Sequence, residues 1–249
     1  MRQAGRTQRL FILAEPRSGS SWLMETLNAR REIQLSEEIL NHVQNSEIKK
    51  YIGGHEGDFH DCLDYLERTL SAAANTRIRF SGCKILLNQL TLIGDRFPEL
   101  FLDFYREASF VFLYRANLVA EHISLHIAHK HNIWHVKQKD QRTLKKVHIS
   151  PPALVANLEK SLRRREIIRE ILNAGRLHCF PLSYEELFSE KENILAEIYA
   201  FLGMAIKKVV FSDEMKGNPF RPQEVIENYQ EVRAYLKAYP VFLKMLLAE

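Results

Sequence analysis

One short stretch near the N-terminus constrains the fold of this 249-residue chain most strongly. Residues 10–14 (LFILA) form an unbroken apolar run that Pro16 soon ends, which is typical of a strand buried on both faces of a parallel sheet. A tight polar turn, PRSGSS, follows, and helical spacing of apolar residues begins at Trp22. The sequence therefore predicts a strand, a loop of phosphate size and a helix, in that order.

The loop between this strand and this helix predicts an anion-binding site. The first N–H groups of a helix have no partner within the helix, and together with the helix dipole they attract an anion. Gly19 lets the backbone approach a ligand closely, Ser20 and Ser21 add hydroxyl donors, and Arg17 adds a positive charge. The alternative is a serine-rich turn that only caps a helix, but the preceding apolar strand favours the anion site. Because the loop has one glycine and no lysine, it is not a Walker A loop, and we expect a dianionic group bound without a metal.

Apolar runs and the helices between them predict an α/β fold with a P-loop-type parallel five-stranded sheet, flanked by helices on both faces. A mostly helical stretch is expected over 42–76, broken at 53–57, and a long helix over 153–174. The length suits a single domain over residues 1–249. The expected strands are 9–15, 33–36, 80–87, 109–115 and 177–182.

The amino-acid composition indicates the class of ligand and the cellular compartment. The net charge of +4 (35 basic minus 31 acidic residues) suits an anionic ligand but is too small to indicate nucleic acid. Three scattered cysteines without metal spacing indicate a reducing compartment. The N-terminal apolar run is too short for a signal peptide or a membrane span, so we expect a cytoplasmic protein. The oligomeric state stays open, and a homo-oligomer is one alternative.

The loop sequence PRSGSSWL closely resembles the 5′-phosphosulfate loop of sulfotransferases that use 3′-phosphoadenosine 5′-phosphosulfate (PAPS). The bacterial branch with the Nod-factor and trehalose sulfotransferases often has PRSGSTLL there, whereas the cytosolic branch has a lysine where Arg17 stands. The resemblance runs from Phe11 to about Tyr229. Its further motifs, in the family's order, are Arg115 with Ser124, AHKHNIWH at 128–135, SYEEL at 183–187 and IYAFLG at 198–203.

The resemblance implies that PAPS is the co-substrate, that 3′-phosphoadenosine 5′-phosphate (PAP) is the product, and that no metal takes part. Arg115 and Ser124 would bind the 3′-phosphate, because arginine binds a phosphate through two parallel hydrogen bonds, and Tyr184 would lie near the adenine. The RKGxxG loop of the cytosolic branch is absent, which leaves the C-terminal contacts to the nucleotide open. The residues assigned to the 5′-phosphosulfate are Arg17, Ser18, Gly19, Ser20 and Ser21, and Trp22 is a further expected contact to the cofactor.

The resemblance also implies direct transfer of a sulfuryl group to an acceptor hydroxyl on a carbohydrate, a lipid or a natural product. Glu38 and Asn41 match a GELFN-like segment whose glutamate is the base, although Glu37 leaves a one-residue ambiguity. The other interpretation is two solvated carboxylates at a helix start. Lys84, followed by Gln89, matches a GFK-like strand, and it either faces the sulfuryl group or is only a strand-end lysine.

Histidines cluster after the fourth expected strand. His122, His126 and His129 share a helical face, so a metal site is one alternative to consider. Only Glu121 joins them, and not in a recognisable ligand pattern, so we expect solvated or acceptor-facing histidines. By analogy with cytosolic relatives, His122, His126 and His135 are the alternatives to Glu38 as the base.

Two other functional classes compete with a sulfotransferase. A P-loop nucleotide or nucleoside kinase is disfavoured because GK[ST] is absent. A catalytically inactive PAP-binding protein would bind the nucleotide without turning over an acceptor. The charged segment 137–146 lacks apolar periodicity and is expected to be a mobile loop or lid.

Overall fold

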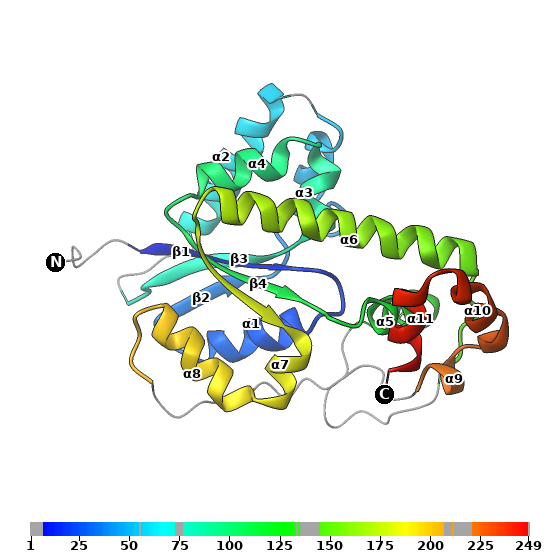
Figure 1. The fold of residues 1–249 in the computed structure, drawn as a ribbon. Helices are drawn as coiled ribbons and strands as arrows, with labels where there is room; N and C mark the ends of the chain where they lie inside the picture. The colour runs from blue at the N-terminus through cyan, green and yellow to red at the C-terminus, as the bar shows by residue number, and fades with distance from the viewer. Residues whose placement is uncertain are drawn as a thin grey trace.

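The computed structural model describes residues 7–54, 56–72, 77–132, 134, 145–206, 211 and 221–248. A parallel five-stranded sheet in the order β2-β3-β1-β4-β5 lies at its centre (Figure 1). All five strands lie where the sequence predicts them, which confirms the predicted α/β fold. The strands are β1 (Gln8–Ala14), β2 (Ile33–Ser36), β3 (Phe80–Leu86), β4 (Ser109–Tyr114) and β5 (His178–Ser183).

β1 is the middle strand because its residues are apolar on both faces. Leu10 and Ile12 pack on one face, Phe11 and Leu13 pack on the other, and all four are fully buried. On the β3 side, Gly82 pairs with Leu10, and a Cβ atom at Gly82 would lie 1.7 Å from the Leu10 carbonyl oxygen. Glycine is therefore required for these two strands to pair at this point.

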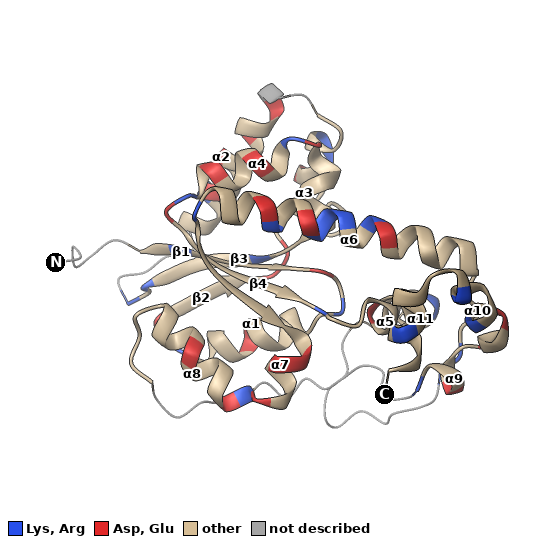
Figure 2. Ribbon diagram, viewed as in Figure 1, with Lys and Arg blue, Asp and Glu red and all other residues tan. Residues whose placement is uncertain are grey.

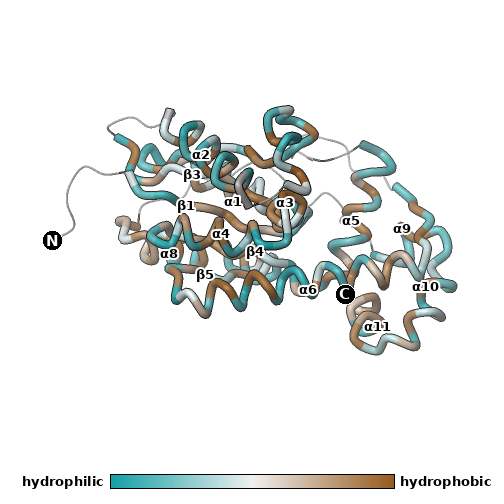
Figure 3. The backbone as a smooth tube through the Cα atoms, turned by 90° about the horizontal axis from the view of Figure 1, so that it is seen from above, coloured by the Kyte–Doolittle hydropathy of each residue, from teal (hydrophilic) through white to brown (hydrophobic). Residues whose placement is uncertain are grey.

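Helices cover both faces of the sheet (Figure 1). In Figure 3 the long helix α6 alternates between brown and teal along its length, as expected for a helix with one side on a core. One face carries α2 (Glu56–Ala72), α3 (Leu87–Ile93), α4 (Phe97–Phe104) and the C-terminal half of α6 (Pro151–Ala174). The other face carries α1 (Ser20–Asn28), α7 (Tyr184–Ser189) and α8 (Lys191–Phe201).

A third apolar cluster lies beyond the carboxyl ends of the strands, on the right of Figure 1. It joins the N-terminal half of α6 to α5 (Leu118–His131) and the C-terminal helices. A 3-10 helix, η1 (Ser46–Tyr51), precedes α2 in the region expected to be mostly helical. The C-terminal helices are α9 (Pro222–Val225), α10 (Tyr229–Tyr235), η2 (Leu236–Ala238) and α11 (Pro240–Leu247). Within the part of the chain that is described, no helix is both long and apolar enough to cross a membrane.

Candidate active site

The PRSGSS loop (residues 16–21) joins the carboxyl end of β1 to the first turn of α1. Gly19 is the residue before α1 and has a φ of 84°, in the left-handed region that favours glycine. Because Gly19 has no side chain, it cannot cap the first N–H groups of α1, and the first bond within the helix runs from Leu23 N–H to the Gly19 carbonyl at 3.1 Å. Arg17 also has a positive φ, 64°. This geometry suits an anion at the start of the helix.

Aromatic rings lie directly against the loop. A Cβ atom at Gly19 would lie 2.9 Å from Cε2 of Phe188 and 3.1 Å from Cδ2 of Tyr184, so only glycine fits beneath these rings. The ring of Trp22 is 5.2 Å from Phe188 and 5.9 Å from Phe211, centroid to centroid. These four rings form an apolar cluster at the side of the loop, in which Trp22 is buried and Tyr184 and Phe188 are partly exposed.

Lys84 connects the loop to the acidic residues that follow β2. Its side chain is buried, and Nζ lies 2.9 Å from Ser21 Oγ. The same Nζ lies 2.8 Å from Glu37 Oε2 and 3.1 Å from Glu38 Oε1. The carboxyl ends of β1, β2 and β3 therefore bring one cation and two carboxylates to one edge of the sheet.

Glu38 is held more firmly than its neighbour Glu37. Its Oε2 accepts hydrogen bonds from Nε2 of Gln89 at 2.7 Å and from Nδ2 of Asn41 at 3.1 Å. Gln89 is itself fixed at the start of α3, where its Oε1 accepts from Leu86 N–H at 3.1 Å. The Glu38 side chain is 16% exposed, whereas the Glu37 side chain is 57% exposed. Glu38 is thus a fixed carboxylate and Glu37 is largely in solvent.

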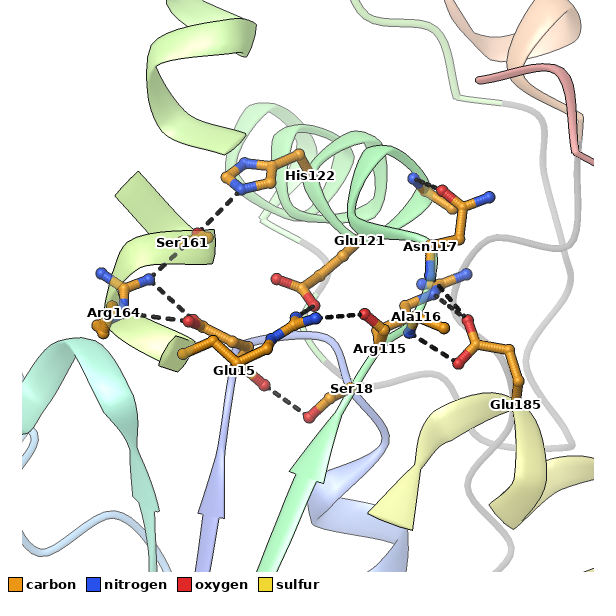
Figure 4. A network of polar contacts seen from close by, with 12 residues as sticks. Glu15, Ser18, Arg115, Ala116, Asn117, Glu121, His122, Ser161, Arg164 and Glu185 are labelled. Atoms are coloured by element: carbon orange, nitrogen blue, oxygen red, sulfur yellow. Dashed lines mark hydrogen bonds and ion pairs between the residues drawn. The ribbon is translucent and has the colours of Figure 1, made fainter. Parts of the chain in front are cut away.

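A second group of polar residues follows β4. The guanidinium of Arg115 lies 4.6 Å from the centroid of the Tyr184 ring. The N–H groups of Ala116 and Asn117 donate to the carboxylate of Glu185 at 2.9 and 3.2 Å (Figure 4). The structure therefore brings together Arg115 and Tyr184, two residues that the sequence assigned separately to the nucleotide. Sequence reasoning missed Glu185, although it is part of the SYEEL motif.

Arg17 and Ser124 link the loop to α5. Nε of Arg17 lies 3.3 Å from Ser124 Oγ, and its Nη1 donates to the carbonyl of Trp134. Two of the remaining predicted loop residues are buried: Ser20 begins α1, and Ser18 Oγ donates to the Glu15 carbonyl at 2.6 Å. His135 and residues 137–144 lie outside the described residues.

The histidines of α5 lie beside the loop but apart from the contacts of Lys84. His122 is buried, its Nε2 lies 3.2 Å from Ser161 Oγ, and burial lowers its pKa to about 4. It is therefore neutral at pH 7. The Nδ1 atom of His126 lies 3.0 Å from the His122 carbonyl oxygen. Among the described residues, no group of three or more His, Cys, Asp or Glu side chains is placed to hold a metal ion.

A cavity of about 780 Å³ opens beside the start of the loop, between α3, α5 and α6. Pro16, Leu92 and Leu125 contribute apolar surface, whereas most of the other lining side chains carry hydrogen-bonding groups. Asn88 of its wall directly precedes Gln89, which contacts Glu38. The cavity is large enough for a small organic molecule, and Glu38 is not among the residues that line it.

The fold of this chain is similar to that of a solved sulfotransferase structure. A sulfotransferase from Alicyclobacillus acidocaldarius is 15% identical, with a TM-score of 0.50 over 94% of this chain and 95% of its own. The mouse sulfotransferase SULT7A1, solved with PAP, is 16% identical with a TM-score of 0.46 over 82% of this chain, which spans 61% of the mouse chain. At 15% identity, the likeness to the Alicyclobacillus protein shows the fold alone.

None of the curated proteins matches this chain. The sequence profile of the sulfotransferase family matches residues 9–208. That range holds the PRSGSS loop, the contacts among Lys84, Glu37 and Glu38, and the turn of Arg115. From this match over most of its length, the chain belongs to the sulfotransferase family.

Proposed function

We propose that the protein transfers a sulfuryl group from PAPS to an acceptor hydroxyl and releases PAP. The observation that carries this proposal is the contact group at the loop. Lys84 Nζ lies 2.9 Å from Ser21 Oγ and 3.1 Å from the Glu38 carboxylate. A cation and a fixed carboxylate thus lie beside the loop that we propose to bind the anion, and sulfuryl transfer requires these three groups.

The loop would hold the 5′-phosphosulfate mainly through backbone N–H groups at the start of α1. Ser18 Oγ is already bonded to the Glu15 carbonyl, so Ser18 would contribute through its backbone. Tyr184 belongs to the ring cluster beside the loop and would lie near the adenine. Arg115 and Ser124 would bind the 3′-phosphate. The proposed loop contacts are Arg17, Ser18, Gly19, Ser20, Ser21 and Trp22.

In the proposed reaction the acceptor oxygen attacks the sulfur, and the bond between sulfur and the bridging oxygen of PAPS breaks. Lys84, Arg17 and the loop N–H groups stabilise the negative charge that grows on the departing PAP oxygen. The acceptor proton moves to Glu38, whose orientation is set by the hydrogen bonds from Gln89 and Asn41. As in phosphoryl transfer, positioning and charge stabilisation supply most of the acceleration.

We place the acceptor in the cavity between α3, α5 and α6. Its lining includes Asn88, Thr91, Asn157 and Lys160, which suit an acceptor with several hydroxyl groups better than a flat apolar one. His126 also lines this cavity and would contact the acceptor rather than the sulfuryl group.

The test is sulfuryl transfer from radiolabelled PAPS to a panel of sugars, lipids and natural-product alcohols, with PAP binding measured by calorimetry. We expect transfer without added Mg²⁺. Phosphoryl transfer from ATP that strictly needs Mg²⁺ would support the kinase alternative instead. PAP binding without turnover of any acceptor would support an inactive binding protein.

The 3′-phosphate contact has its own test. Removing one hydrogen-bonded charge commonly costs about 1.5–3 kcal/mol of binding. Arg115→Ala should therefore weaken PAP by that amount and leave adenosine 5′-phosphosulfate, which lacks the 3′-phosphate, nearly unchanged. Equal losses for both ligands would remove Arg115 from this role.

A further inference from the structure

We propose that Arg164 and Arg165 of α6 are positioning residues, each of which fixes a different part of the nucleotide site. Arg164 would hold the start of the PRSGSS loop, and Arg165 would hold the turn that presents Arg115. The inference rests on the proposed function, because it names the phosphate whose binding each arginine supports. Figure 2 shows the basic residues in the middle of α6, over the carboxyl end of the sheet.

Arg164 holds a carboxylate that comes directly after β1. Its Nε and Nη2 donate to the two carboxylate oxygens of Glu15 at 3.1 and 2.9 Å (Figure 4). The Glu15 side chain is fully buried. Burial raises the pKa of Glu15 above its ordinary value, although the Arg164 guanidinium opposes this rise. A buried carboxylate without its cation is strongly destabilising, so the position of Glu15 depends on Arg164.

The position of Glu15 in turn fixes the start of the loop. Its carbonyl oxygen accepts a hydrogen bond from Ser18 Oγ at 2.6 Å, which closes the first turn of the loop. Ser161, one helical turn before Arg164, adds a hydroxyl 3.2 Å from Nη2 of Arg164. A helix that is 149 residues away in sequence therefore sets where the loop begins.

Arg165 acts on the neighbouring strand. Its Nη1 donates to the carbonyl oxygen of Arg115 at 3.0 Å, and its Nη2 lies 3.6 Å from Glu121 Oε2. Both side chains of this ion pair are buried. Burial raises the pKa of Glu121 well above its ordinary value, and the Glu15 carboxylate adds to this effect. The Arg165 guanidinium acts in the opposite direction, because it favours the charged form of Glu121.

The two arginines thus hold two different ends of the proposed ligand site. Arg164 reaches the residue after β1, where the 5′-phosphosulfate would bind. Arg165 reaches the backbone after β4, where the 3′-phosphate would bind. Misplacement of such groups by about 1 Å can cost about 10²-fold in rate, so a positioning role has a measurable effect.

The test uses substitutions that keep the charge and remove the planar fork, Arg164→Lys and Arg165→Lys. Arg163→Lys is the matched control, because Arg163 is the exposed neighbour on the same helix. Calorimetry is done on the full chain with PAP, adenosine 5′-phosphosulfate and adenosine 3′-phosphate. Together these probes separate the two phosphate positions.

We expect Arg164→Lys to weaken PAP and adenosine 5′-phosphosulfate by about tenfold each and to spare adenosine 3′-phosphate. Arg165→Lys should weaken PAP and adenosine 3′-phosphate by a similar factor and spare adenosine 5′-phosphosulfate. The Arg163→Lys control should match wild type with all three ligands. A residue with only a structural role would lower thermal stability without separating the ligands in this way.

Partner substitutions keep the inference testable if either lysine variant fails to fold. Glu15→Gln should give the ligand pattern of Arg164→Lys, and Glu121→Gln should give that of Arg165→Lys. Variants that bind all three ligands as wild type does, or that lose all three equally, overturn the inference. Wild-type protein that binds none of the three overturns the proposed function itself, and this inference with it.

Discussion

The substitution Glu38→Gln tests the proposed base most directly. It keeps the size of the side chain and removes its basicity. A positioned base contributes about 10²–10⁴-fold in rate, which corresponds to about 3–5 kcal/mol of the activation free energy. We therefore expect kcat for sulfuryl transfer to fall by at least about two orders of magnitude.

The contacts of Glu38 indicate how much the folded state should change. Its amide replacement can still accept from Gln89, but it loses the ion pair with Lys84. Lys84 keeps its contacts with Glu37 and Ser21, so we expect a loss of about 1–2 kcal/mol of stability and PAP affinity close to wild type. A large loss of PAP binding would show that the substitution disturbs the loop and not only the base.

Glu37→Gln is the matched control in the same assay. Both carboxylates contact Lys84 Nζ, but Glu37 is mostly exposed. Initial rates with PAPS and saturating acceptor should show normal kcat for the control. The reasoning is refuted if Glu38→Gln turns over normally, or if Glu37→Gln loses as much activity; a loss confined to a His126 variant would move the base to that histidine.

Two further predictions concern the loop and its support. Gly19→Ala should lower stability and weaken PAP by at least tenfold, because a Cβ would lie 2.9 Å from Phe188 at a φ of 84°, which costs about 1–2 kcal/mol in strain alone. Gly53→Ala is its control, with a φ of 65° and open space around the added atom, and equal stability losses in urea unfolding would contradict the ring contact. His122, whose pKa is lowered to about 4, should make the protein less stable as the pH falls from about 6.5 to 4, because the unfolded chain then binds the additional proton. The His122→Asn variant should lack about 3 kcal/mol of this pH-dependent loss in urea titrations, and a parallel loss in both proteins would contradict the assignment.

Local sequence patterns were sufficient for the sheet and for the loop. An apolar run such as residues 10–14 can be stable only where both faces of the strand are covered. In an α/β fold, the polar turn that follows such a strand connects it to the next helix. The position of Glu38 at the same edge as the loop also follows from the sequence, because the carboxyl ends of parallel strands meet at one edge. These predictions needed only the order of the elements.

Side-chain partners on distant elements were beyond such reasoning. Nothing local distinguishes Arg164 from the exposed Arg163, since the direction of each side chain depends on how α6 crosses the sheet. The buried Glu15 would have looked unfavourable without its partner on that helix. The choice between Glu37 and Glu38 was likewise open in the sequence, and the hydrogen bond from Gln89 is the contact that distinguishes them.

The pairing around Lys84 also gives Glu37 a separate place in the proposed mechanism. Lys84 carries one positive charge and contacts two carboxylates, so an anionic cofactor that approaches Ser21 meets an excess of negative charge. Glu38 is fixed by Gln89 and Asn41, whereas the Glu37 side chain is 57% exposed and can turn into solvent at little cost. Departure of Glu37 would leave Lys84 free to contact the sulfuryl group while the base stays in place. For this reason the Glu37→Gln control should bind PAPS at least as tightly as wild type.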